Sequence, residues 1–320
     1  MLLLRTPDNQ ARILQQLFND LGWDADPELV RKRLLDLNNG LVQEDELIYL
    51  LNWLKNVYLI HKLEQFHVPP SSKLDFSIPD ILIIANTDVG KKPYYIEIKT
   101  SKDHALSWTE KYYNGFKNYS EATGIPVLVA WKWTKFETWT IFKLEDFQQK
   151  TPGGNYKIDL NTAHKRNLIS ELFGDYFIVL PDNVALIIKH QKIKMHPIPE
   201  GEQWETVIEG IYWVDRDGNP VDFKNNGIMA LFFILPLEEV VEQDEHFIYY
   251  KWRPLPNKTL WAQSVPVRLA EIFSDAPVNW LEKIRNQDFQ VGYDGFLADL
   301  TAAIQEGTLQ NIFFFNPNYN

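Results

Sequence analysis

The chain has 320 residues, of which 45% are hydrophobic and 14% aromatic. These fractions exclude a disordered chain, and the length is typical of one large globular domain or two of ordinary size. The sequence contains no cysteine, which excludes disulfides, thiolate metal sites and cysteine nucleophiles.

The apolar segments argue against export and membrane insertion. The run at residues 1–5 is too short for a secretory signal, and the longest run, around residues 228–237, is too short to cross a bilayer as a helix. We therefore expect a soluble, cytoplasmic protein that does not associate with a membrane.

Charge is unevenly distributed along the chain. The formal net charge of −11 argues against coating of nucleic acid by charge alone, because such binding needs Lys and Arg at the phosphates. Residues 91–143 nevertheless hold nine lysines against five acids, whereas residues 200–250 hold twelve acids against two bases. The acidic stretch is either a solvated face or a surface that binds a partner or mimics DNA.

Two helices are predicted near the start of the chain. The first covers residues 27–37 and would end at the Asn-Asn-Gly sequence of residues 38–40. The second covers residues 43–66, where apolar residues recur at helical spacing after an acidic first turn. The proline pair at residues 69–70 would then break the chain.

Strands and helices alternate in the next part of the chain. The predicted elements are strands at 81–85 and 94–98 around a turn at 88–90, a helix over 106–124, a strand over 125–133, and a strand with a short helix over 138–147. This order predicts an α/β fold with a mixed sheet flanked by helices.

A domain boundary is predicted at residues 151–154, a Thr-Pro-Gly-Gly sequence. We expect one domain over residues 1–150 and a second, α+β domain of unknown role over residues 151–320. Its predicted strands lie at 176–180, 184–189, 228–235 and 246–252, and its predicted helices lie at 267–273, 278–284 and 296–305.

Three ionisable residues lie on the two consecutive apolar strands of the first domain. Asp80 follows a proline at the first strand, and Glu97 and Lys99 flank Ile98 on the second. The two-residue period of a strand puts Glu97 and Lys99 on one face. Two neighbouring carboxylates repel each other, and a divalent cation such as Mg²⁺, which prefers oxygen ligands, relieves the repulsion. The simpler alternatives are a turn aspartate and a surface ion pair.

This arrangement resembles the PD-(D/E)XK nuclease superfamily, which includes restriction endonucleases and archaeal Holliday-junction resolvases. The matching residues are Pro79-Asp80 and Glu97-Ile98-Lys99, and the order of strand, turn, strand, helix and strand matches over residues 40–147. The resemblance implies a restriction-endonuclease-like fold in which Asp80, Glu97 and the Ile98 carbonyl bind Mg²⁺ or Mn²⁺. It also implies that Lys99 serves the attacking water.

Many members of the superfamily add an acid from a helix that precedes the aspartate strand. The candidates here are Glu44, Glu46 and Glu64, and we favour Glu46 because it begins the long predicted helix. Glu46 is therefore predicted as a fourth catalytic residue.

Basic and aromatic residues follow the proposed catalytic strand. Lysines beside aromatic rings suit phosphate contact and base stacking. The predicted nucleic-acid contacts are Lys102, Lys111, Tyr113 and Lys117. The alternative is that the aromatic residues belong to the core and the lysines to its solvated flank.

We therefore expect a metal-dependent DNA endonuclease that hydrolyses phosphodiester bonds through the Asp/Glu/Lys site. The resemblance also implies a homodimer, because superfamily members that cut both strands often act as dimers. The substrate could be duplex, branched or single-stranded DNA, or RNA. The alternative function is a non-catalytic module with a nuclease fold that binds nucleic acid or protein.

Overall fold

A computed structural model provides the structure of the chain. It describes residues 26–63, 75–179, 184–199, 201–215, 217–221, 237–255, 259–274, 278–306 and 311–313, and residues 14, 17, 21, 22, 231, 232, 234 and 309; within the first range the side chains of 31–41 are not described.

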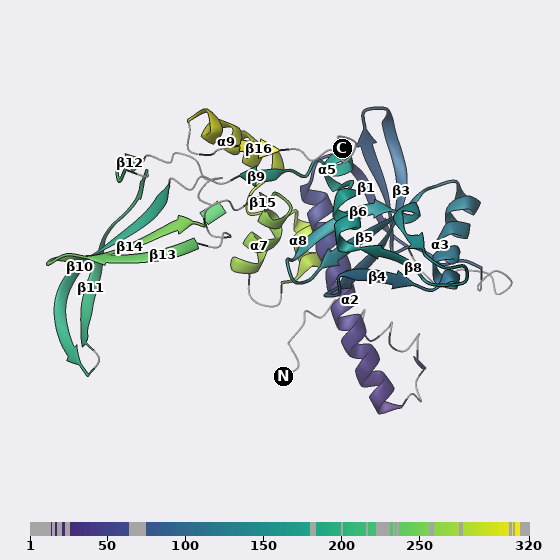
Figure 1. The fold of residues 1–320 in the computed structure, drawn as a ribbon, viewed down its shortest axis with the longest axis horizontal. Helices are drawn as coiled ribbons and strands as arrows, with labels where there is room; N and C mark the ends of the chain where they lie inside the picture. Colours follow the sequence, from purple (N-terminus) through teal and green to yellow (C-terminus); the bar gives the residue numbers. More distant parts are fainter. Residues whose placement is uncertain are drawn as a thin grey trace. The chain divides into compact units, whose positions relative to one another are not determined.

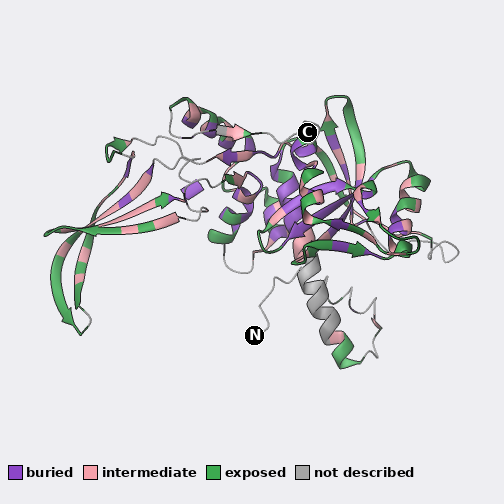
Figure 2. Ribbon diagram, viewed as in Figure 1, coloured by how far each residue is buried: buried purple, intermediate pink, exposed green. Residues whose placement is uncertain are grey.

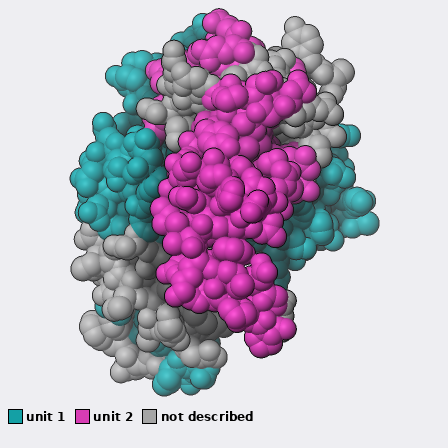
Figure 3. Space-filling view, turned by 90° about the vertical axis from the view of Figure 1, so that its left-hand side faces the viewer, with its two compact units in different colours: residues 1–176, 266–290, 314–320 teal, residues 177–265, 291–313 magenta. Residues whose placement is uncertain are grey.

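The chain forms two compact units, which are coloured separately in Figure 3. Unit 1 comprises residues 1–176, 266–290 and 314–320, and unit 2 comprises residues 177–265 and 291–313. The first unit thus extends beyond the division predicted at residue 150. One reason is that strand β8 (Tyr156–Asp159), which follows the predicted boundary, pairs with strand β4 (Ala105–Trp108) of the same unit.

Unit 1 contains a five-stranded mixed sheet (Figure 1). Its strands, in spatial order, are β1 (Val57–Lys62), β2 (Ile81–Thr87), β3 (Gly90–Ser101), β5 (Val127–Trp133) and β6 (Thr138–Lys143). Only β3 and β5 are parallel, and the chain between them contains helix α3 (Glu110–Thr123). The predicted fold class, a mixed sheet flanked by helices, is confirmed.

Helix α2 (Pro27–Trp53) replaces the two predicted N-terminal helices. Asp26 caps its start, and the helix continues through residues 38–40. An internal glycine costs a helix about 1 kcal/mol, whereas burial of Leu47, Leu50 and Leu51 stabilises by roughly 1.5–3 kcal/mol each. The predicted stop at residues 38–40 is therefore wrong.

The second predicted helix ends too late. Helix α2 stops at Trp53, Asn56 adopts a positive φ of 73°, and residues 57–62 form β1 against β2. Val57 and Ile60 are β-branched, and such side chains favour a strand with a neighbour to pair with. The sequence shows the helical spacing of apolar residues over 57–62, but it does not show that this segment pairs with β2.

Helix α3 begins later than predicted. Residues 106–108 belong to β4, in a small sheet with β8 and β7 (Gln148–Gln149), and the Thr109 side chain accepts a hydrogen bond from Tyr112 N–H at the helix start. Gly124 ends the helix with a φ of 69°, as predicted.

The core of unit 1 encloses strand β5, because all seven of its residues are buried (Figure 2). On the α3 side, Phe116 packs with Val129, Trp131 and Phe142 of the sheet. Several short helices complete the unit: η1 (Leu144–Asp146), α4 (Leu160–Lys165), α5 (Ile169–Phe173), α8 (Trp280–Asn286) and most of α7 (Ser264–Ile272).

Residues late in the chain pack against α2. Tyr49 lies in a cluster with Val267, Ala270 and Trp280, and its ring centroid is 5.1 Å from that of Trp280. The Tyr49 hydroxyl donates to the carbonyl of Asp288 at 3.2 Å. Residues 266–290 are therefore part of the same core as α2.

Unit 2 is built on an antiparallel five-stranded sheet (Figure 1). Its strands, in spatial order, are β12 (Pro220–Val221), β11 (Gly201–Val214), β10 (Ala185–Ile198), β14 (Phe247–Pro254) and β13 (Leu237–Gln243). A small sheet of β15 (Thr259–Trp261), β9 (Phe177–Val179) and β16 (Asn311–Phe313) and helix α9 (Tyr293–Gln305) complete it. The strand predicted over 228–235 is wrong at its described positions, because residues 231, 232 and 234 are helical.

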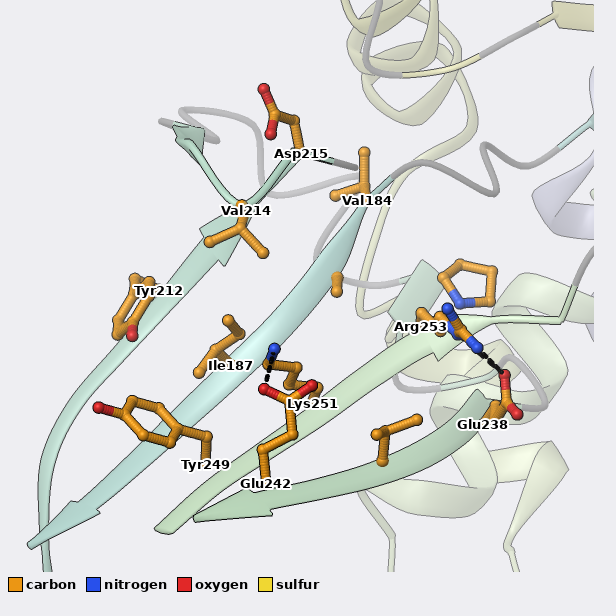
Figure 4. Close-up of a pocket in the computed structure, with 14 residues that line it drawn as sticks. Val184, Ile187, Tyr212, Val214, Asp215, Glu238, Glu242, Tyr249, Lys251 and Arg253 are labelled. Atoms are coloured by element: carbon orange, nitrogen blue, oxygen red, sulfur yellow. Dashed lines mark hydrogen bonds and ion pairs between the residues drawn. The ribbon is translucent and has the colours of Figure 1, made fainter. Parts of the chain in front are cut away.

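One face of the large sheet in unit 2 lines a hollow of about 700 Å³ (Figure 4). The basic side chains that line this hollow pair with acids of the neighbouring strand β13. Arg253 contacts Glu238 at 2.8 Å, and Lys251 contacts Glu242. These two ion pairs neutralise two of the twelve acids in the acidic stretch. The role of the acidic stretch, residues 200–250, in partner binding stays a prediction.

Within the described residues, no helix combines the length and apolar character needed to span a bilayer.

Candidate metal-binding and catalytic site

The fold brings the three predicted site residues together at one end of β2 and β3. Asp80 directly precedes β2, and its backbone N–H donates to the carbonyl of Ile96 at 3.1 Å. The backbone N–H of Ile98 in turn donates to Asp80 Oδ2 at 2.7 Å. The antiparallel pairing of β2 and β3 thus fixes the Asp80 carboxyl beside the Glu97-Ile98-Lys99 triplet.

Glu97 is almost fully buried, with 2% of its surface exposed. Its Oε1 accepts hydrogen bonds from the Lys99 ammonium and from the Tyr112 hydroxyl, the latter at 2.7 Å. Among the described residues its Oε2 has no hydrogen-bond donor when Asp80 is ionised, whereas a protonated Asp80 side chain hydrogen-bonds to Glu97. A buried carboxylate oxygen without a donor is costly and marks a place for a cation or a proton.

The close approach of Asp80 and Glu97 affects the pKa values of the site. Burial, followed by the charge of Glu97, raises the pKa of Asp80 to about 8. Burial alone would lower the pKa of Lys99, but the negative charge of the adjacent Glu97 carboxylate outweighs it and raises that pKa. Lys99 therefore stays an ammonium ion at neutral pH.

The donor set fits a small, hard divalent cation. Asp80 and Glu97 offer carboxylate oxygens, and Mg²⁺ is commonly held by one or two carboxylates together with waters. No cluster of three or more His, Asp or Glu side chains suited to a metal occurs among the described residues. The remaining ligands would therefore be a backbone carbonyl, such as that of Ile98, and water.

The candidate acids of the preceding helix, Glu44 and Glu46, have different partners in the structure. Glu46 is 3% exposed, and both of its oxygens contact the Lys132 ammonium, at 2.6 and 2.7 Å; Trp139 Nε1 donates to Oε1 at 3.0 Å. Its carboxylate is thus fully used in a buried ion pair. The contacts correct the prediction that Glu46 joins Asp80 and Glu97.

Glu44 is the helix acid whose charge interacts with the site. Burial raises the pKa of Glu44, the Lys62 ammonium at 3.0 Å opposes this, and the charge of Asp80 raises it further. Glu64, the third candidate, lies outside the described residues.

The predicted nucleic-acid contacts fall into two groups. Lys102, Lys111 and Lys117 are exposed, and Lys117 lies 3.8 Å from Glu121. Tyr113 is 8% exposed and stacks on Tyr156 with ring centroids 3.7 Å apart, so it is unavailable for base stacking. For Tyr113 the core alternative was right, because a helix residue that faces the sheet is buried.

Sequence reasoning missed Tyr112 as a contact of Glu97. The reason is the helix start, which was predicted at residue 106 but lies at Glu110. Thr109, a good N-cap residue before an acidic first turn, was the signal that would have placed Tyr112 on the first turn.

The mixed sheet and the Asp/Glu/Lys triplet on its adjacent strands are features of PD-(D/E)XK nucleases. Residues 67–175, about a third of the chain, match the family model described as archaeal Holliday junction resolvase (Hjc). The matched segment holds Asp80, Glu97 and Lys99, so the resemblance to this superfamily is confirmed for that segment.

A solved structure of a Holliday junction resolvase, Hjc from the archaeal hyperthermophile Archaeoglobus fulgidus, is also similar. Its sequence is 21% identical, the match covers 39% of this chain and 92% of that chain, and the TM-score is 0.31. A search of curated proteins found no match.

Proposed function

We propose that this chain is a divalent-metal-dependent endonuclease that hydrolyses phosphodiester bonds in branched DNA. The observation that carries the proposal is the convergence of Asp80, Glu97 and Lys99, in which one buried carboxylate oxygen of Glu97 has no hydrogen-bond donor among the described residues when Asp80 is ionised. The match of the surrounding segment to a Holliday junction resolvase family supports the substrate class.

Asp80, Glu97 and the Ile98 carbonyl would hold Mg²⁺ or Mn²⁺, which supplies charge stabilisation to the phosphate and lowers the pKa of a water. Lys99 remains protonated, so it donates hydrogen bonds to the attacking water or to a phosphate oxygen and does not remove a proton. Glu44, whose charge interacts with that of Asp80, would be the helix acid of the site in place of Glu46. The exposed Lys102, Lys111 and Lys117 would contact phosphates.

The test is cleavage of four-way-junction, linear duplex and single-stranded DNA, and of RNA, with Mg²⁺ or Mn²⁺. We expect the wild type to cut the junction best and Lys99→Ala and Asp80→Asn to be inactive while they remain folded. Lys92→Ala is the matched control, because Lys92 is an exposed lysine on the same strand β3. Full activity of Lys99→Ala would contradict the mechanism.

We also propose that the active form is a homodimer, because two symmetry-related cuts in a junction need two sites. Sedimentation of the full chain tests this proposal, and a monomer that still resolves junctions would contradict it.

The competing function is that of a non-catalytic binding module. In that case the folded wild type should bind DNA or a protein without binding metal. Calorimetric titration with Mn²⁺ distinguishes the two functions.

A further inference from the structure

Two hydrogen-bond donors meet on a single oxygen of Glu97. The Tyr112 hydroxyl lies 2.7 Å from Oε1, and the Lys99 ammonium contacts the same atom. With Asp80 ionised, as a metal ligand must be, Oε2 receives no hydrogen bond from the described residues. A carboxylate held in this way cannot rotate freely, so its two oxygens have different roles.

The position of the Tyr112 hydroxyl is itself fixed by packing. Its ring makes edge contacts with Trp108 and Phe116, with centroids 5.0 and 4.9 Å away. Its backbone N–H donates to the Thr109 side chain at 3.3 Å in the first turn of α3. The helix start and an aromatic cluster therefore hold the hydroxyl in place, whereas Lys99 is a flexible side chain that is about one third exposed.

The Lys99 ammonium has three N–H donors and is partly exposed, so it is the donor to Glu97 that can move towards a phosphate or a water. When its ammonium turns towards a phosphate or a water, Oε1 of Glu97 loses one of its two donors. Tyr112 then remains the donor that holds the carboxylate. A partner that fixes a ligand in this way commonly changes metal affinity about 10- to 100-fold.

We propose that Tyr112 is a positioning residue that fixes Glu97 through Oε1 and thereby reserves Oε2 for the divalent cation shared with Asp80. This inference rests on the proposed metal-dependent function and adds a residue to it. Tyr112 does not touch substrate or cation in this role, because its hydroxyl is engaged with Glu97.

The test compares Tyr112→Phe with the wild type and with Tyr119→Phe, all in the full chain. Tyr112→Phe keeps the ring and removes only the hydroxyl. Tyr119 lies on the same helix, and its hydroxyl hydrogen-bonds to Tyr95, so Tyr119→Phe also removes one hydrogen bond but none at the site. Mn²⁺ binding is measured by calorimetry without DNA, and cleavage is then measured over a range of Mn²⁺ concentrations.

For Tyr112→Phe we expect Mn²⁺ affinity to fall about tenfold or more, with the cleavage rate recovering at saturating Mn²⁺. Tyr119→Phe should bind as the wild type does. Equal affinity of Tyr112→Phe and wild type overturns the inference and leaves the proposed function intact. An equal loss in both variants also overturns it, because the cause is then the stability of α3. A wild type that binds no Mn²⁺ overturns the proposed function and this inference together.

Discussion

Glu44 and Glu46 lie two residues apart on α2, yet their carboxylates serve different partners. Glu44 contacts Lys62 at 3.0 Å and interacts with the charge of Asp80, whereas Glu46 contacts Lys132 at 2.6 Å in the core. Two steps along a helix turn a side chain by about 200°, which places the two acids on nearly opposite sides of α2. One acid therefore interacts electrostatically with the candidate site, and the other anchors the helix.

The first prediction concerns these two acids. Glu44→Gln should weaken Mn²⁺ binding about tenfold or more with little change in stability. Glu46→Ala should instead lower the free energy of unfolding by about 3–5 kcal/mol, because it leaves the Lys132 ammonium buried without its partner. Urea denaturation and calorimetric titration of both variants measure the two effects. A stable Glu46→Ala variant that has lost metal binding would reverse the assignment.

A matched double variant separates charge from packing at Glu46. Replacing Glu46 by Leu and Lys132 by Met together removes the buried ion pair and leaves no unpaired charge. We expect this double variant to be more stable than Glu46→Ala, because apolar replacements of buried ion pairs are often neutral.

The second prediction concerns pH. The pKa of Asp80 rises from an ordinary 3.8 to about 8 in the folded protein. Folding therefore favours the protonated acid, so this contribution to stability is full below pH 3.8 and is lost as pH rises towards about 8. Metal-free wild type should lose stability over this window, and Asp80→Asn should lose less. Urea denaturation in EDTA across the range measures the difference.

The same proton competes with the cation. Mn²⁺ affinity of the wild type should rise with pH up to about 8, because Asp80 must release its proton to become a ligand. A pH-independent affinity in calorimetric titrations would contradict the role of Asp80.

The third prediction concerns Gly115, which lies where α3 approaches the segment leading to Asp80. A Cβ at Gly115 would lie 2.3 Å from Ser77 Oγ and 2.9 Å from the Ser77 backbone nitrogen. Gly115→Ala gains up to about 1 kcal/mol of helix propensity, but overpacking typically costs roughly 1–3 kcal/mol. We expect net destabilisation and weaker metal binding.

Gly295 provides the control for this substitution. It also lies in a helix, α9, but a Cβ there would meet no atom within 4 Å. Gly295→Ala should therefore be neutral or stabilising in thermal unfolding. Equal behaviour of the two variants would remove the steric argument at Gly115.

The fourth prediction concerns the exposed lysines. In a Lys99→Ala background, which we expect to prevent cleavage, changing Lys102, Lys111 and Lys117 to Ala should weaken junction binding. It should also reduce the slope of log affinity against log salt by up to about 3, since each phosphate contact contributes about 0.9. Fluorescence anisotropy at several salt concentrations measures both. An unchanged slope would show that these lysines do not contact phosphates.

The strands β2, β3 and β5 and the grouping of Asp80, Glu97 and Lys99 were predictable because their signals are local. A two-residue period places Glu97 and Lys99 on one face, and short apolar runs mark β2, β3 and β5. The partner of Glu46 was not predictable, because Lys132 lies 86 residues later in the chain. The strand β1 was missed for a similar reason, since its helical spacing was overridden by pairing with β2.

The return of residues 266–290 to the core around Tyr49 affects how the chain folds during synthesis. A ribosome that has made only the first 176 residues presents α2 without the side chains that cover Tyr49. Unit 1 therefore completes its core only after most of unit 2 has been made. We expect truncated chains to be retained by chaperones or to aggregate, although they contain Asp80, Glu97 and Lys99.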